Sequence, residues 1–429
     1  MSRTTRKTFG AVGILALALA ACSTSGGGTG LSGTYTIGVW GPASIPQGGD
    51  IRDGAMLAAQ ELNDAGTGAG GREIKIIFCD SIDGASTAEA VDCVKGFIQD
   101  DGVDAIVGGF SSGETLAVLQ TVVDGETIFV ATGAASPDVV AGVESGGERR
   151  FIFRIGPINS TYLAIDMCGT MLKLAAQLGF GKFGILFEDV EFARPLKDFL
   201  AACLANPSEA TQGAIPQETG VEVVSVKPHA FDATDFSSQF SAFEKKGAQI
   251  VIEINSRQEG VALVRQWGET RPPFALVGIN VASQFDAFFE QTEGNAAYEL
   301  NGPAGSTRAP LTPETIPFYD AFMAEYGRNP IYNGLSSYDA VHALAEAVER
   351  AGSAETDAVI TEMEATDRVG TQGRERFGPD HDILYGPLAP DGEGIVPVYF
   401  QWQEDGTKVL VFPEELAGGA TYTLPPWLS

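Results

Sequence analysis

The 429-residue sequence predicts an α/β protein of two lobes, each a parallel β-sheet flanked by helices. Short apolar segments typical of buried strands alternate with amphipathic segments of helical periodicity, which is the pattern of βαβ units. This alternation starts near residue 34 and starts again near residue 150. A chain of this length can form two such units, each with its own core.

The first lobe begins with "TYTIGVW" (34–40), an apolar strand that ends before Gly41-Pro42. Residues 49–65 place Ile51, Ala55, Ala58 and Leu62 on one face of a helix. Further along, the same alternation predicts strands at 72–80, 103–108 and 127–132, and helices at 86–101 and 114–123.

The second lobe repeats the pattern and adds a different ending. Strands are expected at 150–155, 182–189, 221–228, 249–254 and 274–279, and helices at 159–179, 193–205, 236–247 and 258–269. Two long helices (313–327 and 336–352), a shorter helix near 357–365 and a β-rich tail follow. In that tail, residues 397–412 form two strands around an Asp405-Gly406 turn.

The first 21 residues have the order of an export signal. Arg3, Arg6 and Lys7 precede an uncharged apolar stretch at 9–21, which is too short to span a bilayer comfortably. The stretch ends in Leu19-Ala20-Ala21-Cys22, which resembles the bacterial lipobox, whose Cys becomes the lipidated first residue. We therefore expect a lipoprotein signal peptide at 1–21, lipidation of Cys22 and a flexible tether at 22–33. A plain signal peptide and an uncleaved anchor are the alternatives.

Four further cysteines follow Cys22, and in an exported protein an even count favours disulfides over free thiols. We predict the pairs Cys79–Cys93 and Cys168–Cys203. Cys79 ends a strand and Cys93 lies in the helix that packs back on it, while Cys168 and Cys203 lie on helices flanking one strand. Four buried free thiols are the alternative.

Several functional classes find no support in the residues. The net charge is −29, whereas nucleic-acid binding needs a cationic surface. The three histidines, His229, His342 and His381, have no other His or Cys at ligand spacing, so we expect no metal site. We expect no cofactor either. Residues 66–71 match G-x-G-x-x-G, but a helix precedes them and a strand follows. That order is the reverse of a dinucleotide loop, so we interpret them as a helix-to-strand turn.

Residues 109–113 (Gly-Phe-Ser-Ser-Gly) match the G-x-S-x-G pattern that can mark a hydrolase nucleophile, here Ser111. Such an enzyme needs a His base, and His381 between two aspartates is the candidate. The loop follows too few strands for that fold, however, and no oxyanion segment precedes it. Two serines at a helix start are better suited to holding an anion with hydroxyl and free N–H groups.

Taken together, the chain resembles the type I periplasmic binding proteins of branched-chain amino acid and amide ABC importers. The resemblance covers residues 35–427 and is carried by segments 48–81, 103–115, 127–140, 336–353 and 411–427, in this order after the lipobox. It implies two lobes joined by three crossings, near Arg154, near Leu300 and at 370–378. The lobes are then residues 34–154 with 300–370, and residues 155–299 with 371–429.

The resemblance also implies the binding residues. The first lobe would hold a ligand carboxylate through Ser112, with Ser111 beside it, and through the second loop, Gly133, Ala134, Ala135 and Ser136. The second lobe would close over the ligand with Phe192, Ser256 and Asn280, and Trp40 would form a pocket wall.

Four positions depart from the amino-acid-binding pattern. Asn280 replaces an acidic residue for the ligand amine, Ser256 a tyrosine, Gly48 an aromatic residue and Ala135 a hydroxyl residue. An amino acid, an amide, a urea-like solute or a simple carboxylate therefore all remain candidate ligands.

The resemblance implies a non-enzymatic, monomeric protein, exported and held by its lipid on the outer face of the cytoplasmic membrane, or periplasmic. Its partners would be a small ligand and the permease subunits of an ABC importer. A ligand-sensing receptor of the same fold and a surface-anchored serine hydrolase are the alternative functions.

Overall fold

The structure is a computed structural model that describes residues 32–82, 84–156, 159–217, 221–389 and 391–428. Cys22, the signal peptide and most of the tether lie outside the described residues. The described strands are β1 (Thr34–Gly41), β2 (Glu73–Asp80), β3 (Ala105–Gly108), β4 (Ile128–Ala131), β5 (Ile152–Arg154), β6 (Lys182–Glu188), β7 (Glu222–His229), β8 (Ile250–Asn255), β9 (Ala275–Asn280), β10 (Leu300–Asn301), β11 (Arg368–Val369), β12 (Arg374–Glu375), β13 (Tyr399–Trp402) and β14 (Lys408–Phe412).

The α-helices confirm the predicted alternation, with ends that differ by a few residues. They are α1 (Pro46–Asp64), α2 (Thr87–Gly96), α3 (Ser112–Asp124), α4 (Ser160–Leu178), α5 (Ala193–Ala205), α6 (Pro207–Ala210), α7 (Ser237–Lys246), α8 (Glu259–Thr270), α9 (Phe288–Gln291), α10 (Thr315–Tyr326), α11 (Tyr332–Ala351) and α12 (Thr356–Glu364). Short helical turns occur at Phe97–Asp101, Pro137–Val139, Val281–Gln284, Gly386–Leu388 and Pro426–Leu428.

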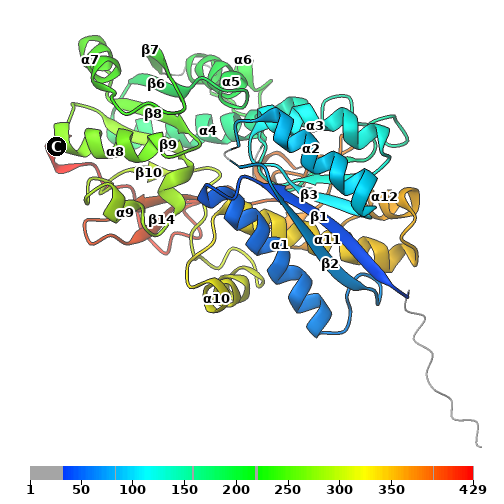
Figure 1. Ribbon diagram of the computed structural model, residues 1–429. Coiled ribbons are helices and arrows are strands. Elements are labelled where there is room, and N and C mark those ends of the chain that lie inside the picture. The colour runs from blue at the N-terminus through cyan, green and yellow to red at the C-terminus, as the bar shows by residue number, and fades with distance from the viewer. Residues whose placement is uncertain (1–31, 83, 157–158, 218–220, 390, 429) are drawn as a thin grey trace, which may run out of the picture.

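The first sheet is parallel throughout and has the order β2-β1-β3-β4-β5. Strands β3 and β4 are fully buried, as expected for short apolar strands covered on both faces. Helix α11 comes from late in the chain and packs on α1 (Figure 1). The glycine-rich segment at 66–71 connects α1 to β2, as predicted, and the side chain of Asn63 closes it through bonds to the Ile74 backbone.

The second sheet has the order β14-β13-β10-β9-β8-β6-β7 and is parallel except at one edge, where two of its strand pairings are antiparallel. Strands β6 to β10 are parallel, but β13 runs antiparallel to β10, and β14 antiparallel to β13. The short Asp405-Gly406 turn makes β14 antiparallel to β13, because a tight turn can join only antiparallel strands. Leu300 and Asn301 belong to this second sheet.

Both predicted disulfides are present in the structure. Cys79 at the end of β2 is bonded to Cys93 in α2, with Cα atoms 5.7 Å apart. Cys168 in α4 is bonded to Cys203 in α5, with Cα atoms 6.1 Å apart. Each bond therefore ties neighbouring elements within the range of normal disulfide geometry.

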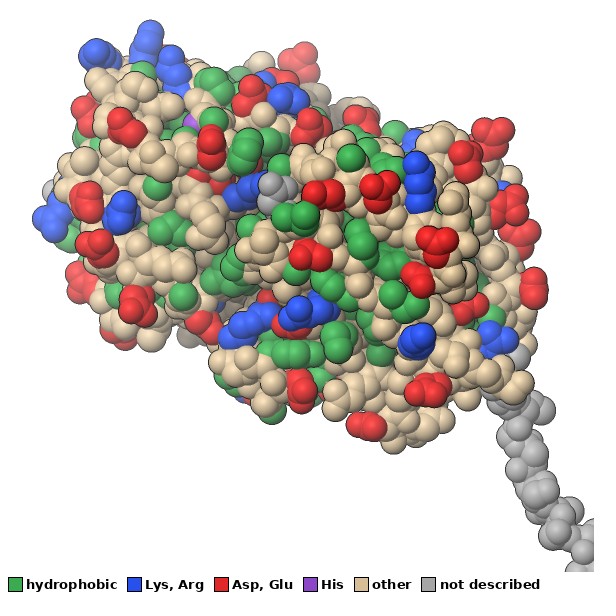
Figure 2. Space-filling view, viewed as in Figure 1, with side chains coloured by type: hydrophobic (Ala, Val, Ile, Leu, Met, Phe, Trp, Pro, Cys, Tyr) green, Lys and Arg blue, Asp and Glu red, His purple; other side chains and the backbone are tan. Residues whose placement is uncertain are grey.

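The surface carries the negative charge that the composition predicts. Figure 2 shows Asp and Glu side chains distributed over the visible face, with Lys and Arg side chains among them. No helix among the described residues is both long and apolar enough to cross a bilayer.

Candidate ligand-binding site

The loop after β3 turns sharply beneath Trp40 and starts helix α3. Gly108 and Gly109 have positive φ angles of 130° and 82°. A Cβ atom at Gly109 would lie 2.6 Å from Thr115 Oγ1 and 2.9 Å from the Trp40 ring, so only glycine fits there. Ser111 precedes the helix in extended conformation and Ser112 is its first residue. The loop thus presents the free N–H groups of a helix start.

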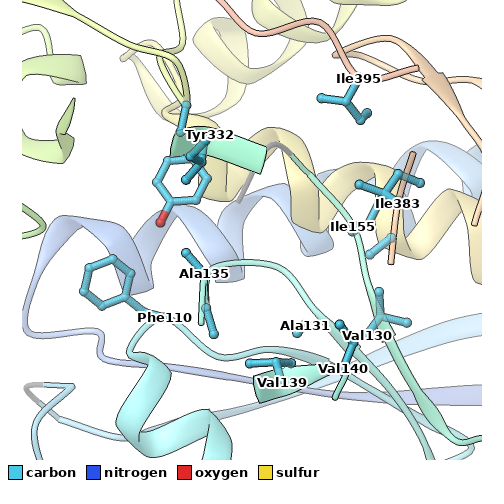
Figure 3. Close-up of a cluster of buried hydrophobic side chains, with 14 of the residues drawn as sticks. Phe110, Val130, Ala131, Ala135, Val139, Val140, Ile155, Tyr332, Ile383 and Ile395 are labelled. Atoms are coloured by element: carbon cyan, nitrogen blue, oxygen red, sulfur yellow. The ribbon is translucent and has the colours of Figure 1, made fainter. Parts of the chain in front are cut away.

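The loop after β4 lies against the first loop and shares a hydrogen bond with it. The backbone N–H of Ser136 donates to Ser112 Oγ at 3.0 Å, which leaves the hydroxyl proton of Ser112 available to another acceptor. The two loops approach so closely at Gly133 that a Cβ atom there would lie 2.6 Å from the Gly109 carbonyl oxygen. Tyr332, at the start of α11, donates to the Gly133 carbonyl at 3.2 Å. Figure 3 shows its ring beside Phe110 and Ala135.

A buried ion pair between Arg154 and Asp382 supports the loop after β4. Arg154 and Asp382 have side chains that are 0% and 2% exposed, and they form two parallel hydrogen bonds of 2.8 and 2.6 Å. Arg154 also donates to the Ser136 carbonyl at 2.7 Å. Paired charges with this fork geometry hold a fixed orientation, so the ion pair positions the loop.

The opposite side of the site is formed by the ends of β6 and β8. Glu188 is fully buried, and its Oε2 accepts from the backbone N–H of Ser256 at 2.9 Å and from Ser256 Oγ at 2.6 Å. Its other oxygen, Oε1, has no hydrogen-bond partner among the described residues. Burial raises the pKa of Glu188, and the Ser256 hydrogen bonds partly oppose that effect.

These elements surround a cavity with an empty volume of about 570 Å³, which includes solvent at its mouth. Both loops of the first sheet and the strand ends of the second sheet contribute to it. Its wall is lined by Phe110, Ser111, Ser112, Gly133, Ala135, Leu163, Glu188, Val190, Glu191, Phe192, Ser256, Arg257, Ile279, Val281, Ala304 and Tyr332. Apolar side chains thus enclose a small number of polar groups, the usual composition of a small-ligand site.

The structure brings six of the ten predicted binding residues together around this cavity: Ser111, Ser112, Gly133, Ala135, Phe192 and Ser256. The other four lie outside its wall. Trp40 is fully buried against Phe129, and Ala134 and Ser136 belong to the second loop, where their carbonyls accept from Arg154.

Asn280 is the fourth residue outside the wall. Its side-chain amide donates to Glu253 on β8 at 3.2 Å and to the Gly260 carbonyl on α8 at 3.3 Å. Its neighbours Ile279 and Val281 line the cavity instead. The wall at this strand end is therefore apolar.

Glu188, Arg257 and Tyr332 line the cavity and were not predicted as binding residues. Glu188 could have been found from its sequence position, because it is an acidic residue that ends the apolar strand "KFGILFE". Parallel strands place such residues at the ligand edge of a sheet. Tyr332 begins a helix far along the chain, and its sequence carries no comparable signal.

The structure does not place His381, the candidate base of the hydrolase interpretation, where it could act on Ser111. His381 is stacked on Phe153, and its ring nitrogens lie 3.2 Å from the Ile152 carbonyl oxygen and 3.0 Å from Glu364 Oε1. A general base must lie within hydrogen-bond distance of its nucleophile. His381 is occupied elsewhere and is not arranged to activate Ser111.

Two further features of the described residues bear on the site. No group of three or more His, Cys, Asp or Glu residues in them is placed to hold a metal ion. A larger hollow, with an empty volume of about 1830 Å³, lies between α4 and segments 369–374, 385–397 and 412–415. None of the ten predicted binding residues lines that hollow, so the smaller cavity is the candidate site.

The chain is similar to known proteins over most of its length. The family model described as "Periplasmic binding protein" matches residues 34–406. The Leu/Ile/Val-binding protein homolog 8 of Brucella melitensis is 26% identical over 377 residues, covering 85% of this chain and 86% of the relative.

Solved structures share the fold. The branched-chain amino acid transporter substrate-binding protein LivJ of Streptococcus pneumoniae, in complex with isoleucine, has a TM-score of 0.70 and 19% identity. The likeness covers 87% of this chain and 97% of that chain. A solute-binding protein of an ABC transporter from Rhodopseudomonas palustris, in complex with 3,4-dihydroxybenzoic acid, has a TM-score of 0.67 and 18% identity. That likeness covers 86% of this chain and 97% of the other.

Proposed function

The chain belongs to the periplasmic binding protein family, and from this premise we propose that it is the substrate-binding protein of an ABC importer. We propose further that its ligand is an α-amino acid with an apolar side chain. The observation that carries this assignment is the pairing of opposite polar groups across an apolar cavity. Ser112 lines one side, and Glu188, whose Oε1 has no hydrogen-bond partner among the described residues, lines the other.

A carboxylate fits the Ser112 side of the cavity. The hydroxyl of Ser112 already accepts from Ser136, so it is oriented to donate its own proton, and the start of α3 adds N–H groups and a positive dipole end. Hydrogen bonds from such donors to a charged acceptor contribute roughly 1.5–3 kcal/mol each.

A cationic group fits the Glu188 side. An ammonium group would supply a donor to Glu188 Oε1, which has none among the residues that the structure describes, and burying the carboxyl without a partner is costly. A simple carboxylate ligand would bring a second negative charge against Glu188, which disfavours it relative to a zwitterion. The residue that pairs with the cationic group of the ligand would thus be Glu188, in place of the acidic residue that the family resemblance expects at Asn280.

Apolar walls fit the remaining part of such a ligand. Phe110, Leu163, Val190, Phe192, Ile279 and Val281 surround the space between the polar groups. The relatives are named for binding leucine, isoleucine and valine, and one solved neighbour holds isoleucine. These names support a branched aliphatic side chain on the ligand.

The cellular setting is part of the proposal. Cys22 would carry the lipid that anchors a monomer at the outer face of the membrane, the tether would give it reach, and the closed protein would deliver its ligand to the permease subunits. Cys22→Ser should abolish membrane association, which fractionation of cells would show. Membrane association of the variant at the wild-type level would contradict the anchor.

The experiment that tests the ligand class is mass spectrometry of the small molecules released when the purified mature protein is denatured. We expect an aliphatic amino acid in an amount comparable to the protein. A stoichiometric ligand without an amino group would overturn the assignment of Glu188, and one without a carboxylate would overturn that of Ser112.

A further inference from the structure

Two buried carboxyl groups converge on one backbone N–H beside the ligand cavity. Ser256 N donates to Glu188 Oε2 at 2.9 Å and lies 3.3 Å from Glu259 Oε1. Glu188 and Glu259 are 0% and 4% exposed, and each has one oxygen without a partner among the described residues. Only Glu188 lines the cavity, whereas Glu259 stands behind it as the first residue of α8.

Among the described residues, few positive charges lie near Glu188 and Glu259 to balance two ionised carboxylates. Arg257 is the neighbouring cation, but its guanidinium also lies over Phe231 and donates to the Gly84 carbonyl. Glu191 adds negative charge from the loop after β6, and Arg194 is shared there between Asp189 at 2.8 Å and Glu191 at 3.7 Å. Burial lowers the pKa of His229, whose strand pairs with that of Glu188, so burial disfavours a positive charge on this histidine.

Two ionised carboxylates are therefore not favourable in the empty site. Taking two like charges out of water beside each other costs more than one cation can offset, and one of the groups retains its proton instead. In agreement, burial raises the pKa of both groups, and the charge of Glu188 raises that of Glu259 further.

We propose that Glu188 and Glu259 share one proton in the ligand-free protein and that binding of a cationic ligand group expels this proton to solvent. The inference rests on the proposed function, because that function brings the ammonium group to Glu188. On binding, the carboxyl O–H bond breaks, the proton passes to the buffer, and the resulting carboxylate pairs with the ligand ammonium. Glu259 is a positioning residue that sets the charge of Glu188 without touching the ligand.

Isothermal titration calorimetry with L-leucine, repeated in two buffers of different ionisation enthalpy, measures the proton release. We expect the wild-type protein to release up to one proton per ligand near pH 7. Its affinity should rise by up to about tenfold per pH unit while the pair remains protonated. Leucine binding with equal heats in both buffers and with an affinity that is constant from pH 6 to 8.5 would overturn the shared proton.

Two variants separate this linkage from binding itself. Glu259→Gln keeps the shape of the side chain but cannot exchange the proton. The variant should still bind L-leucine, and its affinity should change by less than about threefold between pH 6 and 8.5. Ser112→Ala is the matched control in the same cavity. It should weaken binding at every pH and leave the slope unchanged. If the affinity of Glu259→Gln changes with pH as steeply as that of the wild type, the proposed role of Glu259 is wrong.

A measurement on the empty protein tests the pair independently of any ligand. Carbon-13 NMR of protein labelled at the Glu carboxyl carbons should show one member of the pair still protonated at pH 7, with Glu188→Gln and Glu259→Gln assigning the signals. Titration of both groups below pH 5 would overturn the proposal. If L-leucine gives no heat but the NMR shows the proton, the ligand assignment fails and the shared proton stands.

Discussion

Ser112 is the residue on which the anion side of the site depends most directly. Its hydroxyl accepts from Ser136 and lines the cavity, so its proton is free to reach a ligand oxygen. Ser112→Ala should weaken binding of the native ligand by roughly ten- to a hundredfold, because each ~1.4 kcal/mol is a factor of ten. Calorimetry measures the affinity, and the melting temperature of the ligand-free protein should change little.

Ser111 provides the comparison. It also lines the cavity but precedes the helix, and Ser111→Ala should have a smaller effect. Wild-type affinity in Ser112→Ala would contradict the anion site. Stoichiometric labelling of Ser111 by a serine-directed fluorophosphonate would restore the hydrolase interpretation, which the position of His381 does not support.

For single residues, the sequence predicts which strand end a residue follows better than it predicts the direction of its side chain. Ser111, Ser112, Ala135 and Ser256 follow recognisable strand ends, and parallel strands place their ends at one edge of a sheet. Asn280 shows the limit. Successive strand residues point to opposite faces, so a one-residue difference in register exchanges Asn280 for the apolar Ile279 in the cavity wall.

At the scale of elements, the second sheet contains an acidic pair that should make stability depend on pH. Glu253 on β8 and Glu299 before β10 are both fully buried. Burial raises the pKa of Glu253, as does the charge of Glu299, and burial also raises the pKa of Glu299. Their folded pKa values lie above the unfolded ones. The folded protein therefore binds more protons, and its stability falls as the pH rises from about 4.5 through the folded values.

Glu253→Gln tests this dependence, because the amide can still donate to Glu299 but does not titrate. The variant should lose less stability between pH 5 and 8 than the wild type, by about 1–3 kcal/mol. Urea unfolding at several pH values measures the difference. Parallel pH profiles for the two proteins would show that the pair does not retain its proton.

The elements themselves were largely predictable from periodicity, but their pairing was less so. The alternation of strands and helices appears in the structure in the predicted order. Strands β13 and β14 pair antiparallel to each other, as the predicted Asp405-Gly406 turn requires. Their attachment to β10 is a long-range contact that local patterns do not encode.

At the scale of the whole molecule, we predict hinge closure on ligand binding. Two hydrogen bonds join cavity-lining residues to distant segments, since Gln47 Nε2 donates to the Ser256 carbonyl at 2.9 Å and Arg257 donates to the Gly84 carbonyl. We propose the three crossings near Arg154, near Leu300 and at 370–378 as the hinge. Small-angle scattering should show a more compact protein with ligand than without. Identical profiles at saturation would count against closure.

The central claim is that the cavity recognises a carboxylate and an ammonium group on one aliphatic molecule. Calorimetric titration of the ligand-free protein with L-leucine, 4-methylpentanoate and 3-methylbutylamine tests it directly, because each analogue lacks one charged group. We predict that L-leucine binds at least a hundredfold more tightly than either analogue, since each loses a charge-assisted contact and leaves its buried partner unpaired. Equal affinity for L-leucine and 4-methylpentanoate would contradict the account, because Glu188 would then have no part in recognition.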